Sequence, residues 1–263
     1  MKPSCSIARL PEELVSAALS LTSPRDACRA AAVSPAFRAA ADSDAVWACF
    51  LPPLADRLPL SDGEPLPAGR KKDLFLRLSG SSVLLPGGLM SMWLDRETGA
   101  TCYMVSATEL SIAWRDTPQY WTWIPLEDSR FSESAELISA CWLEICGKIH
   151  SKMLSQGSTY AVYTASSPAA EPYGLDFPIN ASVSVGGSVM ACKVCLQHDP
   201  CMIHPEDVAL PHERVDGWME LELGEFVCEA GEDGDVSFGL SETECLNTKS
   251  GLILQGIEIR GKN

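Results

Sequence analysis

The chain has 263 residues, and its 20 lysines and arginines against 35 aspartates and glutamates give a formal net charge of -15. Nucleic acids and anionic membrane surfaces are bound through a basic footprint, which this composition lacks, so both classes of partner are excluded. With 46% hydrophobic residues the sequence is too apolar for a disordered chain, and its length allows one large domain or two small ones.

The ends and the cysteines of the sequence indicate a compartment. No apolar run approaches the ~18 residues that a membrane span requires, and the N-terminus shows no apolar signal core. Eleven cysteines without a secretory signal favour reduced thiols over a disulfide framework. We therefore expect a protein of the cytoplasm and nucleus.

The first fifty residues have the pattern of short helices. Pro11 stands where the first turn of a helix tolerates a missing N–H, and Leu14 and Leu21 follow on one helical stripe. Ser23 and Pro24 start a second helix, with a hydroxyl cap and a proline at the first helical position. The double proline at 52–53 ends the helical segment, so we expect a small helical domain over residues 1–53.

Residues 54–80 are expected to form a linker with a short helix. Prolines and glycines recur over 59–69 and mark a loop. The segment 71–78 that follows has helical spacing of its leucines and phenylalanine.

From residue 81 the hydrophobic period changes to two, which is typical of half-buried strands. The alternating segments are 141–149, 183–185, 218–223 and 257–260. Turn signals separate them at 95–99, 168–174 and 231–234. This half has ten basic and 26 acidic residues, so it carries the whole negative excess. The pattern predicts an antiparallel β-sandwich, similar to a jelly roll, over residues 81–263.

Four motifs in the helical half occur in a fixed order. They are Leu-Pro-Glu-Glu-Leu at 10–14, Ser-Pro-Arg-Asp at 23–26, Val-Ser-Pro-Ala-Phe-Arg at 33–38 and Asp-Ala-Val-Trp at 44–47. Together they resemble an F-box, a small three-helix module that docks on the Skp adaptor of a cullin-based ubiquitin ligase.

The F-box resemblance implies a set of adaptor-binding residues: Leu10, Pro11, Leu14, Leu21, Pro24, Val33 and Trp47. A fifty-residue module with an alanine-rich core buries little surface by itself, so apolar side chains left exposed would mark an interface. The alternative is a helical cap that packs on the second domain.

Four blocks of the second half also occur in a fixed order: 109–123, 135–149, 213–226 and 249–260. They resemble the plant phloem-lectin domain, also called the Nictaba domain, and the resemblance covers residues 85–262. It implies a β-sandwich that binds carbohydrate, with a glycoprotein or N-glycan as the ligand.

A sugar site needs a flat aromatic ring for the C–H face of a pyranose and polar groups for its hydroxyls. The resemblance maps the family's sugar-contacting tryptophans onto Trp114 and Trp121, and its paired glutamates onto Glu213 and Glu220. Two alternatives stay open: either tryptophan could instead fill the sandwich core, and Glu220 could lie on a solvated strand face.

Three other tryptophans, Trp93, Trp123 and Trp142, are expected in the core or packed on a strand face. A jelly roll of this size requires large side chains inside, which is also the reason that Trp114 and Trp121 could be core residues.

A short segment has five potential zinc ligands: Cys192, Cys195, His198, Cys201 and His204. Such spacing could wrap one tetrahedral ion. However, the segment begins as a strand, which would point the first two cysteines to opposite faces, and the resemblance supplies no metal. We expect free thiols, no metal and no cofactor.

Catalysis is not expected. A glycosidase needs two carboxylates flanking a cleft, and Glu213 and Glu220 are candidates by composition only. No phosphate-binding glycine loop, nucleophile elbow or zinc-protease helix occurs. The sequence therefore predicts a non-catalytic substrate receptor of a ubiquitin ligase, which reaches a cullin scaffold through the Skp adaptor and selects glycosylated targets. The alternative is the same adaptor with a sandwich that reads a protein surface without binding sugar.

Overall fold

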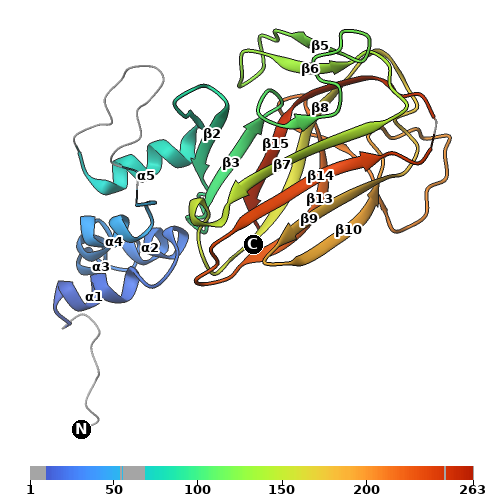
Figure 1. The fold of residues 1–263 in the computed structure, drawn as a ribbon. Coiled ribbons are helices and arrows are strands. Elements are labelled where there is room, and N and C mark those ends of the chain that lie inside the picture. Colours follow the sequence, from blue (N-terminus) through green and yellow to red (C-terminus); the bar gives the residue numbers. More distant parts are fainter. Residues whose placement is uncertain (1–9, 54, 56–68, 246, 263) are drawn as a thin grey trace. The chain divides into compact units, whose positions relative to one another are not determined.

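The computed structural model describes residues 10–53, 55, 69–245 and 247–262 (Figure 1). It divides into two compact units, residues 1–83 with 92–101, and residues 84–91 with 102–263. Most of the loop expected between 54 and 70 lies outside the described residues. In the part of the chain that is described, no helix combines the length and apolar character needed to cross a membrane.

The first unit contains five helices among the described residues. They are α1 (Glu12–Leu19), α2 (Pro24–Ala31), α3 (Pro35–Ala41), α4 (Asp44–Cys49) and α5 (Lys71–Gly80). Serines cap the starts of α2, α3 and α4: the hydroxyls of Ser23, Ser34 and Ser43 accept hydrogen bonds from backbone N–H groups of the first turn. The predicted helical module is confirmed, with four short helices in place of the expected three.

The core of this unit is built around Trp47. Its ring lies 5.1 Å from Phe75 of α5 and 5.7 Å from Phe50, and its Nε1 donates a hydrogen bond of 2.6 Å to the carbonyl of Ala41. Leu78 of α5 is also fully buried in this cluster. The helix that was expected to belong to a linker therefore completes the helical core.

The second unit is an antiparallel β-sandwich, as predicted. Its larger sheet contains β3 (Thr101–Ser106), β5 (Trp121–Ile124), β6 (Ser134–Leu137), β8 (Ser158–Tyr173), β12 (His212–Glu213), β13 (Met219–Cys228) and β15 (Ser250–Gly261). Strands β1 (Val83–Leu84) and β2 (Met90–Leu94) include residues of the first unit, Val83 and 92–94. The six-stranded sheet is formed by β4 (Ser111–Ile112), β7 (Leu143–His150), β9 (Ile179–Val185), β10 (Ser188–Val194), β11 (Val208–Ala209) and β14 (Asp235–Glu242). A 3-10 turn, η3 (Ser151–Met153), follows β7.

The strand order determines which segments meet. Within the second unit the larger sheet runs β3-β15-β8-β13-β12, and β6 joins β15 to β5. The six-stranded sheet runs β11-β10-β9-β14-β7-β4 and, in the view of Figure 1, lies in front of β15, β8 and β13. Each described pairing in the second unit is antiparallel except β10 with β11.

The core lies between the two sheets. Alternate residues of the strands point inward and are buried, for example Ile145, Val183, Leu221, Leu240 and Ile257. Gly224 of β13 faces β9 so closely that a Cβ there would approach Val183 Cγ2 to 3.2 Å. The predicted period of two thus corresponds to real inward and outward faces.

The turn expected at 168–174 is shorter than the sequence indicates. Strand β8 continues to Tyr173, and Pro168 is paired with Leu252 of β15 next to an irregularity in the register. An irregular register tolerates a residue without an N–H. Only Gly174, with φ +67, has the backbone of a turn glycine here.

Candidate functional site

The loop between β4 and β5 holds Trp114 in a strained conformation. Its φ is +58, which makes it the one non-glycine residue with positive φ in the described part of the chain. For a bulky side chain this region costs about 1–2 kcal/mol. The hydrogen bonds that hold the loop include Ala113 N to the Glu144 carbonyl (2.9 Å), Thr117 N to the Trp114 carbonyl (2.9 Å) and Trp121 Nε1 to the Ala113 carbonyl (3.1 Å).

The strained backbone presents the Trp114 indole to solvent beside two other aromatic rings. Its centroid lies 5.1 Å from Tyr120 and 6.0 Å from Trp142, and the exposed fractions of Trp114 and Trp142 are 46% and 43%. The Trp142 indole N–H donates a hydrogen bond of 3.3 Å to Glu144 Oε2. We call Trp114, Tyr120 and Trp142 the aromatic platform; a carboxylate stands at its edge.

The two tryptophans that the resemblance indicated have different roles in this geometry. Trp114 is exposed, whereas Trp121 is 3% exposed and its indole is hydrogen-bonded to the loop. Trp121 therefore positions Trp114 and presents no ring to a ligand. Trp123 lies beneath the Arg115 guanidinium at 5.0 Å.

The sequence reasoning missed Trp142 and Tyr120. Trp142 was expected in the core or on a strand face, but it is among the exposed residues. A signal for this was available, because it alternates with the inward-facing Leu143 and Ile145 and so belongs to the outward set.

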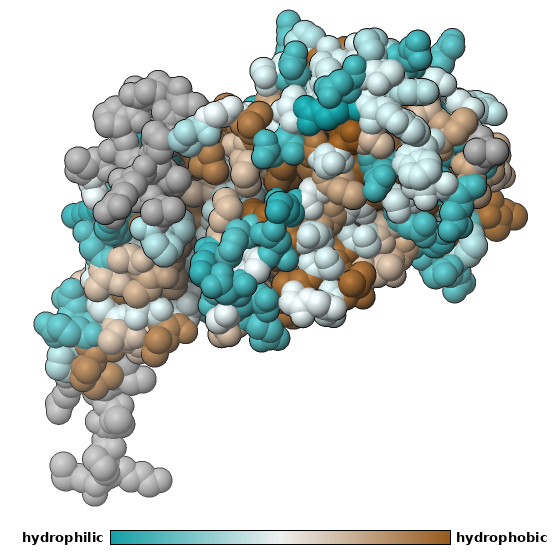
Figure 2. Space-filling model, viewed as in Figure 1, coloured by the Kyte–Doolittle hydropathy of each residue, from teal (hydrophilic) through white to brown (hydrophobic). Residues whose placement is uncertain are grey.

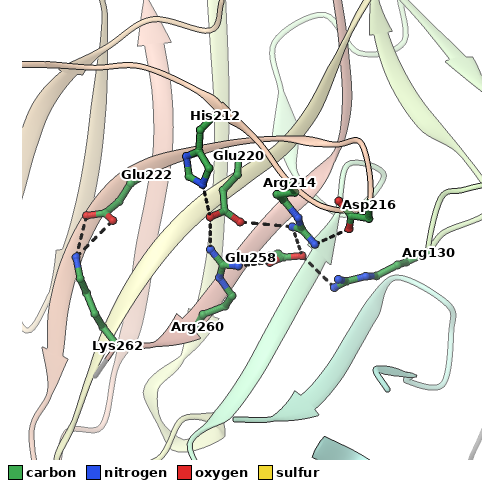
Figure 3. Close-up of polar contacts among 9 residues, drawn as sticks. All are labelled: Arg130, His212, Arg214, Asp216, Glu220, Glu222, Glu258, Arg260 and Lys262. Atoms are coloured by element: carbon green, nitrogen blue, oxygen red, sulfur yellow. Dashed lines mark hydrogen bonds and ion pairs between the residues drawn. The ribbon is translucent and has the colours of Figure 1, made fainter. Parts of the chain in front are cut away.

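Glu220 is buried in an ion-pair network on the outer face of the larger sheet (Figure 3). Its Oε1 lies 2.6 Å from Arg260 and 3.3 Å from His212 Nε2, and its Oε2 lies 3.6 Å from Arg214. The Arg260 guanidinium in turn covers the Tyr163 ring at 3.9 Å. The alternative that Glu220 lies on a solvated face is therefore wrong: arginines from other segments cover it.

The centre of the same network is Glu258, which is 1% exposed. Arg130 and Arg214 each approach its Oε1 at 3.0 Å, and Arg260 lies 3.6 Å from its Oε2. Burial would lower the pKa of Arg214, but the attraction of Glu258 outweighs it and raises that pKa. The pKa of Arg260 is raised in the same way, by its hydrogen bond to Glu220 against the effect of burial. The carboxylates of Glu220 and Glu258 are therefore both ion-paired with arginines.

Glu213 and Glu220 do not face the same ligand. In the register of β12 and β13, His212 is paired with Glu220 and Glu213 with Met219. Because neighbouring residues of a strand point to opposite faces, the two glutamates lie on opposite sides of the sheet. Glu213 lines a separate pocket of about 410 Å³ with His198 and Met219. This arrangement provides neither a carboxylate pair around one sugar ring nor the two flanking carboxylates of a glycosidase.

The tryptophans are also remote from the glutamates. Strands β6, β15, β8 and β13 lie between β5, which carries Trp121, and β12, which carries Glu213. At about 4.8 Å per strand the separation along the sheet is about 24 Å. The four sequence-derived residues thus lie in four places: Trp114 in the aromatic platform, Trp121 buried beneath its loop, Glu220 in the ion-pair network and Glu213 in the second pocket.

The helical unit carries an exposed apolar surface. Five of the seven residues that the F-box resemblance indicated are exposed: Leu10, Pro11, Leu14, Leu21 and Val33. Brown, apolar side chains are visible at the surface of this unit in Figure 2. The other two, Pro24 and Trp47, are buried, so they can affect docking only through the positions of the helices.

The first two cysteines of the cysteine-rich segment, Cys192 and Cys195, point in different directions, as expected for a segment that begins as a strand. Cys192 Sγ lies 3.3 Å from the Leu223 carbonyl, whereas Cys195 Sγ lies 3.1 Å from the Asp176 carbonyl and 3.6 Å from His204 Nδ1. Burial raises the pKa of the Cys195 thiol to about 11, so it is protonated at neutral pH. Among the described residues no three histidine, cysteine or acidic side chains are grouped to hold a metal.

Comparison with known proteins agrees with this two-part organisation. The F-box-like family model matches residues 7–51 and the Phloem protein 2 model matches residues 100–261. F-box protein PP2-B1 of Arabidopsis thaliana is 38% identical, covering 95% of this chain and 88% of that protein. F-box protein PP2-B10 of the same plant is 39% identical, covering 95% and 92%. Among solved structures, the CBM22-1 xylan-binding domain of Paenibacillus barcinonensis Xyn10C aligns with 60% of this chain and 85% of its own at 11% identity and a TM-score of 0.30, a likeness too distant to bear on function.

Proposed function

Because the chain belongs to the family of F-box proteins with a phloem protein 2 domain, and such a protein is a substrate receptor, we propose that it assembles into an Skp–cullin–F-box ubiquitin ligase and selects glycoprotein targets by binding their glycans. The F-box would bind the Skp adaptor, and the sandwich would bind carbohydrate without catalysing a reaction. The aromatic platform is the observation that carries the carbohydrate part.

The platform has the chemistry of a sugar-stacking surface. Exposing an indole to water has a free-energy cost, and the strained backbone of Trp114 adds a further cost. Such costly features are typical of functional sites. The C–H face of a pyranose packs on an indole, and its hydroxyls can donate to Glu144 at the edge of the platform. This assigns the acceptor role to Glu144 in place of Glu213 and Glu220.

The affinity expected from such a site is low. One stacked ring and one or two hydrogen bonds to a charged group, worth about 1.5–3 kcal/mol each when shielded, are offset by the cost of ordering the ligand. The surplus corresponds to a dissociation constant of about 0.1 to 1 mM. A receptor with a weak single site gains selectivity when the ligase also contacts the target protein.

The exposed apolar residues in α1, on either side of it and in the turn after α2 support the adaptor part. Leucines and valine that stay exposed in a small helical unit form the type of patch that a partner covers. We place this assembly in the cytoplasm and nucleus, where the free cysteines of the described chain would remain reduced.

The test is isothermal calorimetry of the full chain against neutral N-glycan fragments at millimolar concentration. Wild type should bind, and Trp114→Ala should lose at least about tenfold in affinity, because the stacking ring is removed. Tyr173→Ala is the matched control, since it removes another exposed aromatic ring, 67% exposed, that is not part of the aromatic platform. If wild type binds no oligosaccharide while it still captures the adaptor, the sandwich reads a protein surface instead.

A further inference from the structure

The outer face of the six-stranded sheet carries a groove of about 500 Å³. Residues of β4, β7, β14 and β9 line most of it, and five of them are serines: Ser111, Ser182, Ser184, Ser237 and Ser241. Glu109 and the buried Val105, Phe238 and Leu240 also contribute to the lining. This face is turned to the viewer in Figure 2, where its middle is mostly pale, the colour of residues near zero hydropathy. A volume of this size is typical of ligand sites, which span about 300–1,000 Å³.

The register of the strands explains why the floor of the groove is low. One row across the sheet runs from Ser111 through Cys146 and Gly239 to Ser182, so each position has a small side chain. Gly239 must be small, because a Cβ there would approach the Ile145 carbonyl oxygen to 2.5 Å. The next row pairs Ser237 with Ser184. Small residues on four neighbouring strands, β4, β7, β14 and β9, thus leave a trough that crosses the strands.

The groove begins at the aromatic platform. Glu144 lines it and also accepts the hydrogen bond from the Trp142 indole. Its backbone carbonyl accepts from Ala113 N, one residue before Trp114. A ligand stacked on the platform therefore meets the groove directly across Glu144.

The lining is suited to a neutral, hydroxyl-rich ligand. A serine hydroxyl both donates and accepts, which matches the hydroxyls of a sugar. The formal charges among the lining residues are two glutamates and Lys148, and this lysine is already paired with Asp235 at 2.8 Å. An anionic ligand would find no free cationic cluster among these residues, and an apolar ligand would leave the serine hydroxyls without partners.

We propose that this groove binds the further sugar rings of an oligosaccharide whose first rings occupy the aromatic platform. The inference rests on the proposed carbohydrate binding and deepens it, because it assigns a second surface, on the opposite sheet from Glu213 and Glu220, and predicts a preference for longer glycans. Each sugar ring that lies across the strands forms hydrogen bonds with serine hydroxyls. The hydroxyls of the sugar that contact no serine remain hydrated.

The experiment compares two neutral probes by calorimetry on the full chain: the disaccharide N,N′-diacetylchitobiose and the trimannosyl N-glycan core pentasaccharide. We expect wild type to bind the pentasaccharide about tenfold more tightly, the gain from one or two added net hydrogen bonds. Ser182→Ile fills the groove and removes a hydroxyl while suiting a strand; it should abolish this gain and leave the disaccharide affinity unchanged. Ser188→Ile, at an exposed serine of the adjacent strand outside the lining, is the matched control and should behave as wild type.

The outcomes separate the two proposals. If wild type binds neither probe, carbohydrate binding itself is refuted, and the groove proposal with it. If wild type binds both probes with equal affinity, or Ser182→Ile retains the full gain, the groove proposal alone is overturned. Ser237→Ile, on the neighbouring strand, repeats the test independently of any local effect at Ser182.

Discussion

Replacing Glu220 by glutamine separates a ligand-binding role from a structural one. The family resemblance makes Glu220 a sugar contact, whereas its burial against Arg260, Arg214 and His212 makes it part of the ion-pair network. Glu220→Gln keeps the shape and one acceptor oxygen but removes the charge. We expect the protein to lose stability and to keep its affinity for sugar.

The magnitude follows from the burial of the partners. Removing one partner of a fully buried ion pair costs about 3–5 kcal/mol, because a charge is left uncompensated. Here the side chains of Arg260 and Arg214 are 28% and 17% exposed and retain Glu258 as a partner, so the cost falls to about 2–3 kcal/mol. For a domain of this size that corresponds to a fall in Tm of about 4–12 °C.

The assay is urea denaturation followed by tryptophan fluorescence, together with calorimetry of sugar binding. Glu222→Gln is the matched control, since Glu222 lies two residues along the same strand and its partner Lys262 is 38% exposed; it should cost less than about 1 kcal/mol. A Glu220→Gln protein with wild-type stability but no sugar binding would refute the structural interpretation.

Three further outcomes are expected. Leu14→Asp should abolish capture of the Skp adaptor with little loss of stability, because Leu14 is 57% exposed. Ala39→Asp, at an exposed alanine of α3 outside the seven residues that the F-box resemblance indicated, should change capture less; a pull-down and a thermal melt decide this. The pKa of Glu242 is lowered chiefly by two backbone N–H groups that donate to it. The ionised carboxylate therefore stabilises the fold at neutral pH, and this stabilisation is lost as the pH falls below about 4. Glu242→Gln should weaken the fall of the unfolding free energy on the acid side of its pH profile; an unchanged profile would contradict the assignment. With a buried thiol and a pKa raised to about 11, Cys195 should resist iodoacetamide under native conditions while the exposed Cys28 reacts, which mass spectrometry of the alkylated peptides can measure.

The sequence predicted the elements better than the site. Serine and proline at 23–24 start a helix through contacts within one turn, and a period of two marks half-buried strands without reference to their partners. The extension of β8 past Pro168 was missed, because it depends on pairing with β15, more than 80 residues later. The packing of α5 in the helical core was missed for the same reason. The residue spacing predicted a helix, but it did not show that Phe75 and Leu78 would pack in one cluster with Trp47.

The sequence by itself determined the two-part organisation, the fold class and the family, because motifs and hydrophobic periods are properties of neighbouring residues. Tertiary structure decided what the candidate residues do. It exposed Trp114 and buried Trp121, because one indole nitrogen is hydrogen-bonded to the loop that carries the other ring. It buried Glu220 against Arg214 and Arg260, which are adjacent only in the folded sheet. The groove of serines exists only when β4, β7, β14 and β9 align their small residues in one row, and a register between distant strands is not encoded in any single one of them.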